Sequence, residues 1–228
     1  MPAAKEINAV LTCFTQRRFA EATALARSLT TRFPRYGTGW KALAMSLLEQ
    51  KRLEEALESM QRAAALSPND PEVHNGLGSI FRAQNRHAEA EACMRQALQI
   101  KPDFAEAYSN LGPVLATLGR LAEAEVTLRR ALELGPETAA IHTNLSQVLR
   151  LQGRQAEAEA SVRRGLELNP NLPEAHNNLA LICKVLSRLT EAEASLRCVL
   201  EKRPDHVQTL NNLGSIHIDQ GRLDDAEA

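Results

Sequence analysis

Residues 105–138 read AEAYSNLGPVLATLGRLAEAEVTLRRALELGPET, and this 34-residue pattern recurs along the whole chain. Its most regular markers are a proline and an alanine. The prolines are Pro34, Pro68, Pro102, Pro136, Pro170 and Pro204, and the alanines are Ala22, Ala56, Ala90, Ala124, Ala158, Ala192 and Ala226. A fixed period of this length is the sequence signature of a repeat protein. We therefore expect a single array of six full repeats, 3–36, 37–70, 71–104, 105–138, 139–172 and 173–206, followed by a partial repeat, 207–228.

Each repeat has the pattern of two helices joined by a tight turn. In residues 105–138, the pair Leu111–Gly112 predicts a first helix with a small residue where another helix approaches closely, and we expect Ala124 to face it. In residues 121–134, apolar side chains return every three or four positions, which predicts an amphipathic second helix. The recurring proline then ends this helix, because it lacks a backbone donor. The turns carry Gly119, Gly153, Gly221 or Asn85, residue types that tolerate the left-handed conformation.

Composition narrows the class of protein. Hydrophobic residues make up 44% of the chain but aromatic residues only 4%, which favours helices over strands. A net charge of −1 provides no excess of positive charge for a nucleic acid or an anionic membrane, so we expect neither partner. No apolar run approaches the roughly 20 residues that span a bilayer. Because Arg17 and Arg18 follow the first apolar stretch rather than precede it, a signal peptide is not expected, and we predict a soluble cytoplasmic protein.

The chemistry-bearing residues form no motif for a metal, a cofactor or catalysis. Cys13, Cys93, Cys183 and Cys198 contain no CxxC pair, and His74, His142 and His176 recur at one packing position of the first helices. No phosphate-binding loop, dinucleotide-binding GxGxxG or HExxH motif is present. We expect this chain to have no cofactor, no metal and no catalytic site, while the full-length protein is left open.

The order of large and small residues in each unit resembles the tetratricopeptide repeat. In residues 105–138 the matching residues are Tyr108, Leu111, Gly112, Leu115, Gly119, Ala124, Leu128, Ala131 and Pro136. The resemblance implies an all-α, right-handed superhelical solenoid whose first helices line an inner groove. Because ligand peptides of relatives lie in that groove, the resemblance implies a protein–protein interaction scaffold that binds an extended polypeptide.

Asparagines are abundant at the positions that the resemblance assigns to the groove. The candidate binding residues are Asn75, Asn110, Asn144, Asn177, Asn178, Asn211 and Asn212, together with the basic residues Arg82, Arg150 and Lys184. Asn8, Asn110, Asn144, Asn178 and Asn212 share the 34-residue period. A side-chain amide has donors and an acceptor that can bracket a peptide unit without reading its side chain. Alternatively, the asparagines bridge neighbouring helices, and the basic residues serve solubility rather than favouring acidic ligands.

Charged pairs recur on the second helices. They are Glu91–Arg95, Glu125–Arg129, Glu159–Arg163 and Glu193–Arg197, each with the acid four residues before the base. We interpret these pairs as a solvated outer face. The carboxylate clamp of chaperone adaptors, another use of this repeat, is disfavoured because Met45 stands where the clamp needs asparagine beside Lys41.

Two alternatives to a free-standing scaffold remain. Residues 104–112, FAEAYSNLG, resemble the repeats of O-linked N-acetylglucosamine transferases. The opening of the chain, with Asn8, residues 18–22, Phe33–Pro34 and Trp40–Lys41, resembles the start of bacterial proteins that join these repeats to a glycosyltransferase or sulfotransferase domain, which implies a substrate-holding N-terminal arm of a larger enzyme. The sequence stops at Ala228 inside a predicted repeat, leaving Leu213, Ile216 and Leu223 without the cap that repeat arrays require. We expect either that the chain continues or that a homo-oligomeric scaffold buries this end by self-association.

Overall fold

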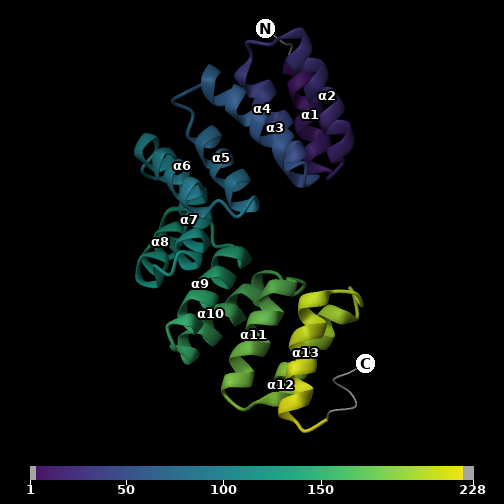
Figure 1. Ribbon diagram of the computed structural model, residues 1–228, viewed down its shortest axis with the longest axis vertical. Coiled ribbons are helices and arrows are strands. Elements are labelled where there is room, and N and C mark those ends of the chain that lie inside the picture. Colours follow the sequence, from purple (N-terminus) through teal and green to yellow (C-terminus); the bar gives the residue numbers. More distant parts are fainter. Residues whose placement is uncertain (1–3, 223–228) are drawn as a thin grey trace. The chain divides into compact units, whose positions relative to one another are not determined.

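The computed structural model describes residues 4–222, and Leu223 and Ala226, with the end of the predicted repeat 207–228, lie outside the described residues. Within residues 4–222 there are thirteen helices and no strand (Figure 1). The helices are α1 (Ala4–Thr15), α2 (Phe19–Arg32), α3 (Gly37–Glu49), α4 (Leu53–Leu66), α5 (Pro71–Ala83), α6 (His87–Ile100), α7 (Ala105–Thr117), α8 (Leu121–Leu134), α9 (Ala139–Leu151), α10 (Gln155–Leu168), α11 (Pro173–Val185), α12 (Leu189–Leu200) and α13 (Val207–Asp219). The predicted all-α solenoid is confirmed.

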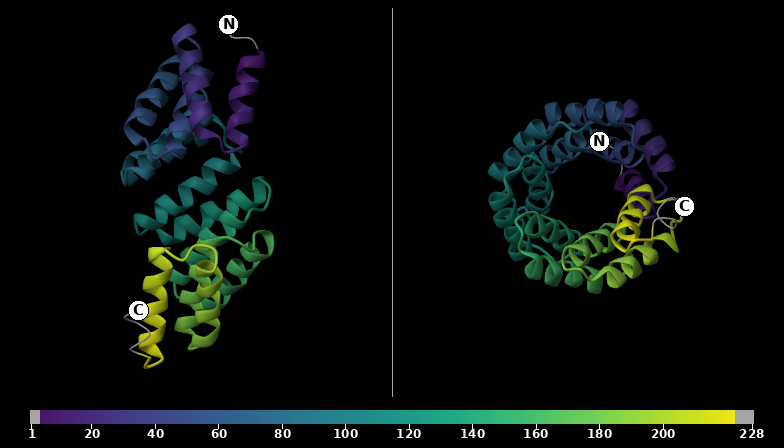
Figure 2. Two further views of the ribbon diagram at one scale, coloured as in Figure 1. Left: turned by 90° about the vertical axis from the view of Figure 1, so that its right-hand side faces the viewer. Right: turned by 60° about the horizontal axis from the view of Figure 1, so that its bottom comes forward.

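The chain divides into two compact units, Met1–Leu118 and Gly119–Ala228. Within each unit, every helix packs on the next one along the chain, and each odd-numbered helix also packs on the next odd-numbered helix. Within either unit, the described parts of the even-numbered helices do not approach one another to a Cα separation of 8 Å. A stack whose helices lie closer together on one side curves toward that side. The odd-numbered helices therefore form the inner layer of each unit (Figure 2), and we call their exposed surface the A-helix face.

Small residues let the two helices of a repeat approach closely, as predicted. The recurring alanines of residues 22 to 192 are all completely buried. A Cβ atom placed on Gly78 would lie 2.6 Å from Cγ of Met94 and 3.1 Å from the carbonyl oxygen of Ala90. The position after the apolar residue of α5 thus faces the recurring alanine of α6, and only glycine fits there without displacing its neighbours.

The turn between the two helices of each repeat takes the left-handed conformation at one fixed position. Gly119, Gly153 and Gly221 have φ values of 74° to 79°, and Asn85 has a φ of 60°, as their residue types predicted. Arg17, Lys51 and Ser187 adopt the same conformation with φ of 59°, although their Cβ atoms disfavour it. The repeat geometry therefore determines the backbone here, and residue type does not.

A recurring side-chain contact links four of the first helices, α3, α5, α7 and α11, to the proline before them. An aromatic or histidine side chain reaches the proline carbonyl oxygen six residues earlier. The pairs are Trp40–Pro34, His74–Pro68, Tyr108–Pro102 and His176–Pro170, with separations of 2.7 to 3.2 Å. Each contact satisfies a carbonyl group at the boundary between repeats. In the described part of the chain, no helix is both long enough and apolar enough to cross a bilayer.

Candidate functional site

The A-helix face of the first unit contains a hollow of about 260 Å³. Helices α1, α3 and α5 form its walls, and α7 contributes one residue to its rim. The apolar part of the lining consists of Val10, Leu11, Phe14, Ala42, Met45 and Gly76. An apolar cavity of about 150 Å³ is large enough to hold a benzene ring. The hollow therefore has room for one large apolar side chain.

The hollow forms where the asparagine ladder is interrupted. In the predicted repeats 37–70 and 71–104, Ala42 and Gly76 occupy the ladder position that is asparagine in the other repeats. A Cβ atom on Gly76 would lie 2.5 Å from Cε of Met60 and 3.7 Å from Sδ of Met45. Because neither ladder position carries an amide here, the half-buried Met45 is accessible from the A-helix face, while Met60 stays completely buried.

Lys41 lies on the rim of the hollow between two carboxylates. Its Nζ atom is 2.9 Å from Oδ2 of Asp70 and 2.7 Å from Oε2 of Glu72. Burial by itself lowers the pKa of Lys41, but the hydrogen bonds to Glu72 and Asp70 outweigh burial and raise this pKa above its ordinary value. Asp70 also caps α5 by accepting a hydrogen bond from the backbone N–H of Glu72 at 2.9 Å. Lys41 is thus protonated at neutral pH and paired with two carboxylates of its own chain.

Glu106 reaches the rim from α7 and has no cationic partner among the described residues. The Nδ2 atom of Asn75 donates to Oε1 of Glu106 at 3.0 Å, and Nδ2 of Asn110 donates to Oδ1 of Asn75 at 3.1 Å. Asn75 is only 3% exposed, whereas Glu106 is exposed. Two of the predicted groove asparagines therefore hold an unpaired carboxylate beside the apolar hollow.

In the second unit, three of the predicted groove asparagines bridge neighbouring odd-numbered helices. Asn177 is 2% exposed and its Nδ2 atom donates to Oγ1 of Thr209 at 2.9 Å. The Nδ2 atom of Asn212 donates to Oδ1 of Asn177 at 2.8 Å, and that of Asn178 donates to the carbonyl oxygen of Thr143 at 3.1 Å. These contacts correspond to the bridging alternative that the sequence left open.

The remaining predicted groove residues, two asparagines and three basic residues, make fewer contacts. Asn144 and Asn211 form no side-chain hydrogen bond with any described residue, so their amide groups remain available. Arg82 is exposed, while Lys184 binds a serine and an aspartate of α13. Arg150 is half-buried without an ion-pair partner in residues 4–222, and burial lowers the pKa of its guanidinium.

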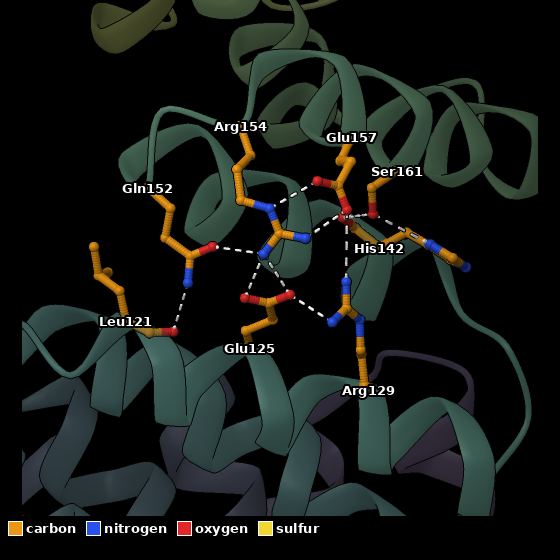
Figure 3. Close-up of polar contacts among 8 residues, drawn as sticks. All are labelled: Leu121, Glu125, Arg129, His142, Gln152, Arg154, Glu157 and Ser161. Atoms are coloured by element: carbon orange, nitrogen blue, oxygen red, sulfur yellow. Dashed lines mark hydrogen bonds and ion pairs between the residues drawn. The ribbon is translucent and has the colours of Figure 1, made fainter.

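A separate polar network, which the sequence reasoning missed, links neighbouring repeats through the even-numbered helices (Figure 3). Glu125 of α8 is only 7% exposed, and Nη1 of Arg154 lies 2.7 Å from both of its carboxylate oxygens. Arg154 also donates from Nε to Glu157 at 2.7 Å, and Arg129 pairs with Glu125. Burial alone would raise the pKa of Glu125, but the hydrogen bonds from Arg154 and Gln152 and the charge of Arg129 outweigh it and lower this pKa.

The prediction of a solvated outer face is therefore wrong for the glutamates of the recurring pairs. Glu159 and Glu193 are also nearly covered, with side chains 12% and 11% exposed, and they bind Arg188 at 2.7 Å and Arg222 at 3.1 Å. The sequence signal for this network is a third periodic residue, an arginine, which pairs across repeats where the preceding second helix carries the recurring glutamate. Its members are Arg18, Arg52, Arg86, Arg120, Arg154, Arg188 and Arg222.

His142 departs from the contact made by the other first-helix histidines. Its Nε2 atom lies 2.7 Å from Oε1 of Glu137, whose other oxygen is 2.7 Å from Nη2 of Arg164. The hydrogen bonds from Arg164 and then His142 lower the pKa of Glu137 to about 2. Within residues 4–222, no three histidine, cysteine, aspartate or glutamate side chains gather in a way that could hold a metal ion.

Two family models match the chain. The model described as the cilia and flagella-associated protein 70 C-terminal domain matches residues 10–169, and one described as a tetratricopeptide repeat matches residues 184–228. None of the curated proteins matches the chain in sequence. The resemblance to O-linked N-acetylglucosamine transferases stays a prediction, because neither family model describes such an enzyme.

Several solved structures share the fold. The crystal structure of the APC/C hetero-tetramer Cut9–Hcn1 matches 92% of this chain with a TM-score of 0.87 and 19% sequence identity, and this chain spans only 42% of that one. PilW, described as a widely conserved type IV pilus biogenesis factor, has a TM-score of 0.75 and 25% identity over 84% of this chain and 89% of its own. YrrB, described as a TPR protein with an unusual peptide-binding site, has a TM-score of 0.56 and 24% identity over 75% and 88%.

Proposed function

Because the chain belongs to the tetratricopeptide-repeat family of the cilia and flagella-associated protein 70 C-terminal domain, we propose that it is an interaction scaffold that binds an extended polypeptide on its A-helix face. The observation that carries the proposal is the hollow on this face in the first unit, lined by three successive odd-numbered helices. Concave apolar surfaces with a few convergent polar groups are typical of binding sites. The peptide-binding site ascribed to YrrB, which has the same fold, supports the assignment.

The predicted groove residues take different parts in this proposal. Asn144 and Asn211 have free amides that suit contact with an extended backbone, because an amide offers two donors and one acceptor. Asn75, Asn110, Asn177, Asn178 and Asn212 contribute by holding the helices and rim groups in place. Arg82 and Arg150 lack ion-pair partners in residues 4–222, which leaves them able to attract acidic groups of the polypeptide, whereas Lys184 is already paired.

Site-specific photo-crosslinking tests the proposal. A random peptide library displayed on phage is selected against the chain, and enriched peptides are mixed with a protein carrying p-benzoylphenylalanine at position 11 or at position 58. Leu11 lines the hollow and is 52% exposed, whereas Glu58 lies exposed on α4, outside the A-helix face. We expect crosslinks from position 11 and few from position 58. Equal crosslinking from both positions, or the absence of any enriched peptide, would contradict the proposal.

Two alternatives rest on separate observations. The free amides of Asn144 and Asn211 suit sequence-tolerant binding, as in the substrate-holding arm of a glycosyltransferase or sulfotransferase, which a donor-binding domain in the same polypeptide would establish. Val207 and Ile218 of α13 are 69% and 57% exposed, which favours a homo-oligomeric scaffold that pairs through this helix. Neither alternative requires catalytic residues in this chain.

A further inference from the structure

We propose that the hollow of the first unit is a subsite that selects an apolar side chain with a lysine or arginine next to it in the bound polypeptide. The inference rests on the proposed function and specifies the chemistry of its ligand. Two independent features of the first unit carry it: the apolar lining of the hollow and the unbalanced charge of its rim.

The lining favours a large apolar side chain. Leu11 and Phe14 of α1, Ala42 and Met45 of α3 and Gly76 of α5 all line the hollow. Methionine is flexible and polarisable, so Met45 adapts to apolar groups of different shape. Burying a leucine, methionine or phenylalanine side chain corresponds to about a 10- to 100-fold gain in affinity over leaving it exposed.

The rim favours a cation on the ligand. Glu72 and Glu106 line the hollow and Asp70 pairs with Lys41 beside it, so three carboxylates stand against the single ammonium of Lys41, a net charge of −2. Lys41 is already paired twice, so it has little capacity left to bind an acidic group. Glu106 accepts one hydrogen bond, from Asn75, and a carboxylate has about four acceptor sites. A lysine or arginine beside the apolar anchor completes this unpaired group, whereas an acidic neighbour would be repelled.

The second unit supplies matched positions without these features. Glu174 of α11 is exposed and stands at the helix position of Glu106, and Gln147 of α9 is exposed and stands at the position of Ser79, which lines the hollow. Glu174→Gln therefore repeats the chemical change of Glu106→Gln away from the subsite, and Gln147→Leu places the same leucine at the equivalent position of the second unit.

The test compares phage-selected peptides on the intact chain and on single variants by fluorescence anisotropy. Wild type is expected to enrich peptides with an apolar residue adjacent to lysine or arginine. S79L, which fills the hollow, is expected to weaken the binding of these peptides at least tenfold, while Q147L leaves their affinity unchanged. E106Q is expected to weaken the binding of these peptides about two- to fivefold, which is the range that the loss of an exposed ion pair produces. This loss should vanish when the basic residue of the peptide is replaced by glutamine, and E174Q should have no effect.

The outcomes separate this inference from the proposed function. Peptides that crosslink to the A-helix face but show no apolar–basic preference, or that ignore both S79L and E106Q, would overturn the inference and leave the scaffold proposal standing. Failure of any peptide to bind the A-helix face would overturn both. Circular dichroism of each variant verifies that helix content is unchanged, and E106Q, at an exposed residue, keeps the test valid if S79L folds poorly.

Discussion

Ser187 occupies a backbone conformation that suits glycine better than serine. Its φ of 59° is left-handed, and this conformation costs a residue other than glycine about 1–2 kcal/mol. Glycine avoids this cost, but its greater conformational freedom in the unfolded chain cancels part of the gain. We therefore expect Ser187→Gly to raise the free energy of unfolding by about 0.5–1 kcal/mol. Urea denaturation followed by circular dichroism measures the change.

The reciprocal substitution at the same repeat position provides the control. A Cβ atom on Gly153, whose φ is 79°, would have nothing within 4 Å, so Gly153→Ala tests the conformational cost alone. It is expected to lower the free energy of unfolding by about 1 kcal/mol. If both variants shifted stability in the same direction, the left-handed turn would not be the cause.

Residue type and spacing predicted the turn glycines but not the roles of the asparagines. Gly119 and Gly153 have a positive φ, and glycine is the residue type that adopts this conformation most readily, so their identity predicted the turns. Asn177 and Asn178 have the same identity, but successive helix residues point about 100° apart. One is consequently buried between helices and the other is half-buried, and the packing of the neighbouring repeats decides which partner each amide binds.

At the scale of elements, the sequence predicted the helix pairs correctly, because the residues at their packing contacts recur with the 34-residue period. Small residues mark the close approaches, and Gly78 against Ala90 is one of them. The Arg–Glu network was not predicted, because an (i, i+4) pair on one helix looks the same whether or not the next repeat covers it. Only the arrangement of α8 and α10 shows that Arg154 reaches back to Glu125.

The close approach of α5 and α6 is sensitive to a single methyl group. Gly78→Ala would bring Cβ to 2.6 Å from Met94, and we expect this overpacking to lower the free energy of unfolding by about 1–3 kcal/mol. Gly39→Ala is the control, because a Cβ atom there would lie 3.5 Å or more from its neighbours, and alanine favours the helix by up to about 1 kcal/mol. A lower melting temperature for Gly39→Ala than for Gly78→Ala would refute this account of the interface.

At the scale of the whole chain, the carboxylates make stability depend on pH. The pKa values of Glu125 and Glu193 lie below their ordinary value of 4.5, and that of Glu137 is about 2. Below pH 4.5 the unfolded chain therefore binds more protons than the folded chain. The stability that these groups contribute is complete above this pH and is lost as the pH falls toward the folded-state values.

Glu125→Gln separates the junction network from the general effect of acid. The variant is expected to lose about 1.5–3 kcal/mol of unfolding free energy near neutral pH, because it removes hydrogen bonds between charged groups. Its stability should also decline less steeply than that of wild type as the pH falls below about 4.5, as measured by urea denaturation at each pH. Glu133→Gln removes an exposed carboxylate of the same helix and should match wild type in both respects.

In the second unit, different interactions hold the helices together within each of the two layers. Odd-numbered helices pack directly on one another, whereas even-numbered helices are linked across repeats by arginines whose side chains are 35% to 40% exposed. Dissolved salt weakens charge pairs that water can reach and leaves apolar packing largely intact. We therefore expect the second unit to bend more easily as the ionic strength rises, because salt loosens its even-numbered layer while the odd-numbered layer keeps its packing.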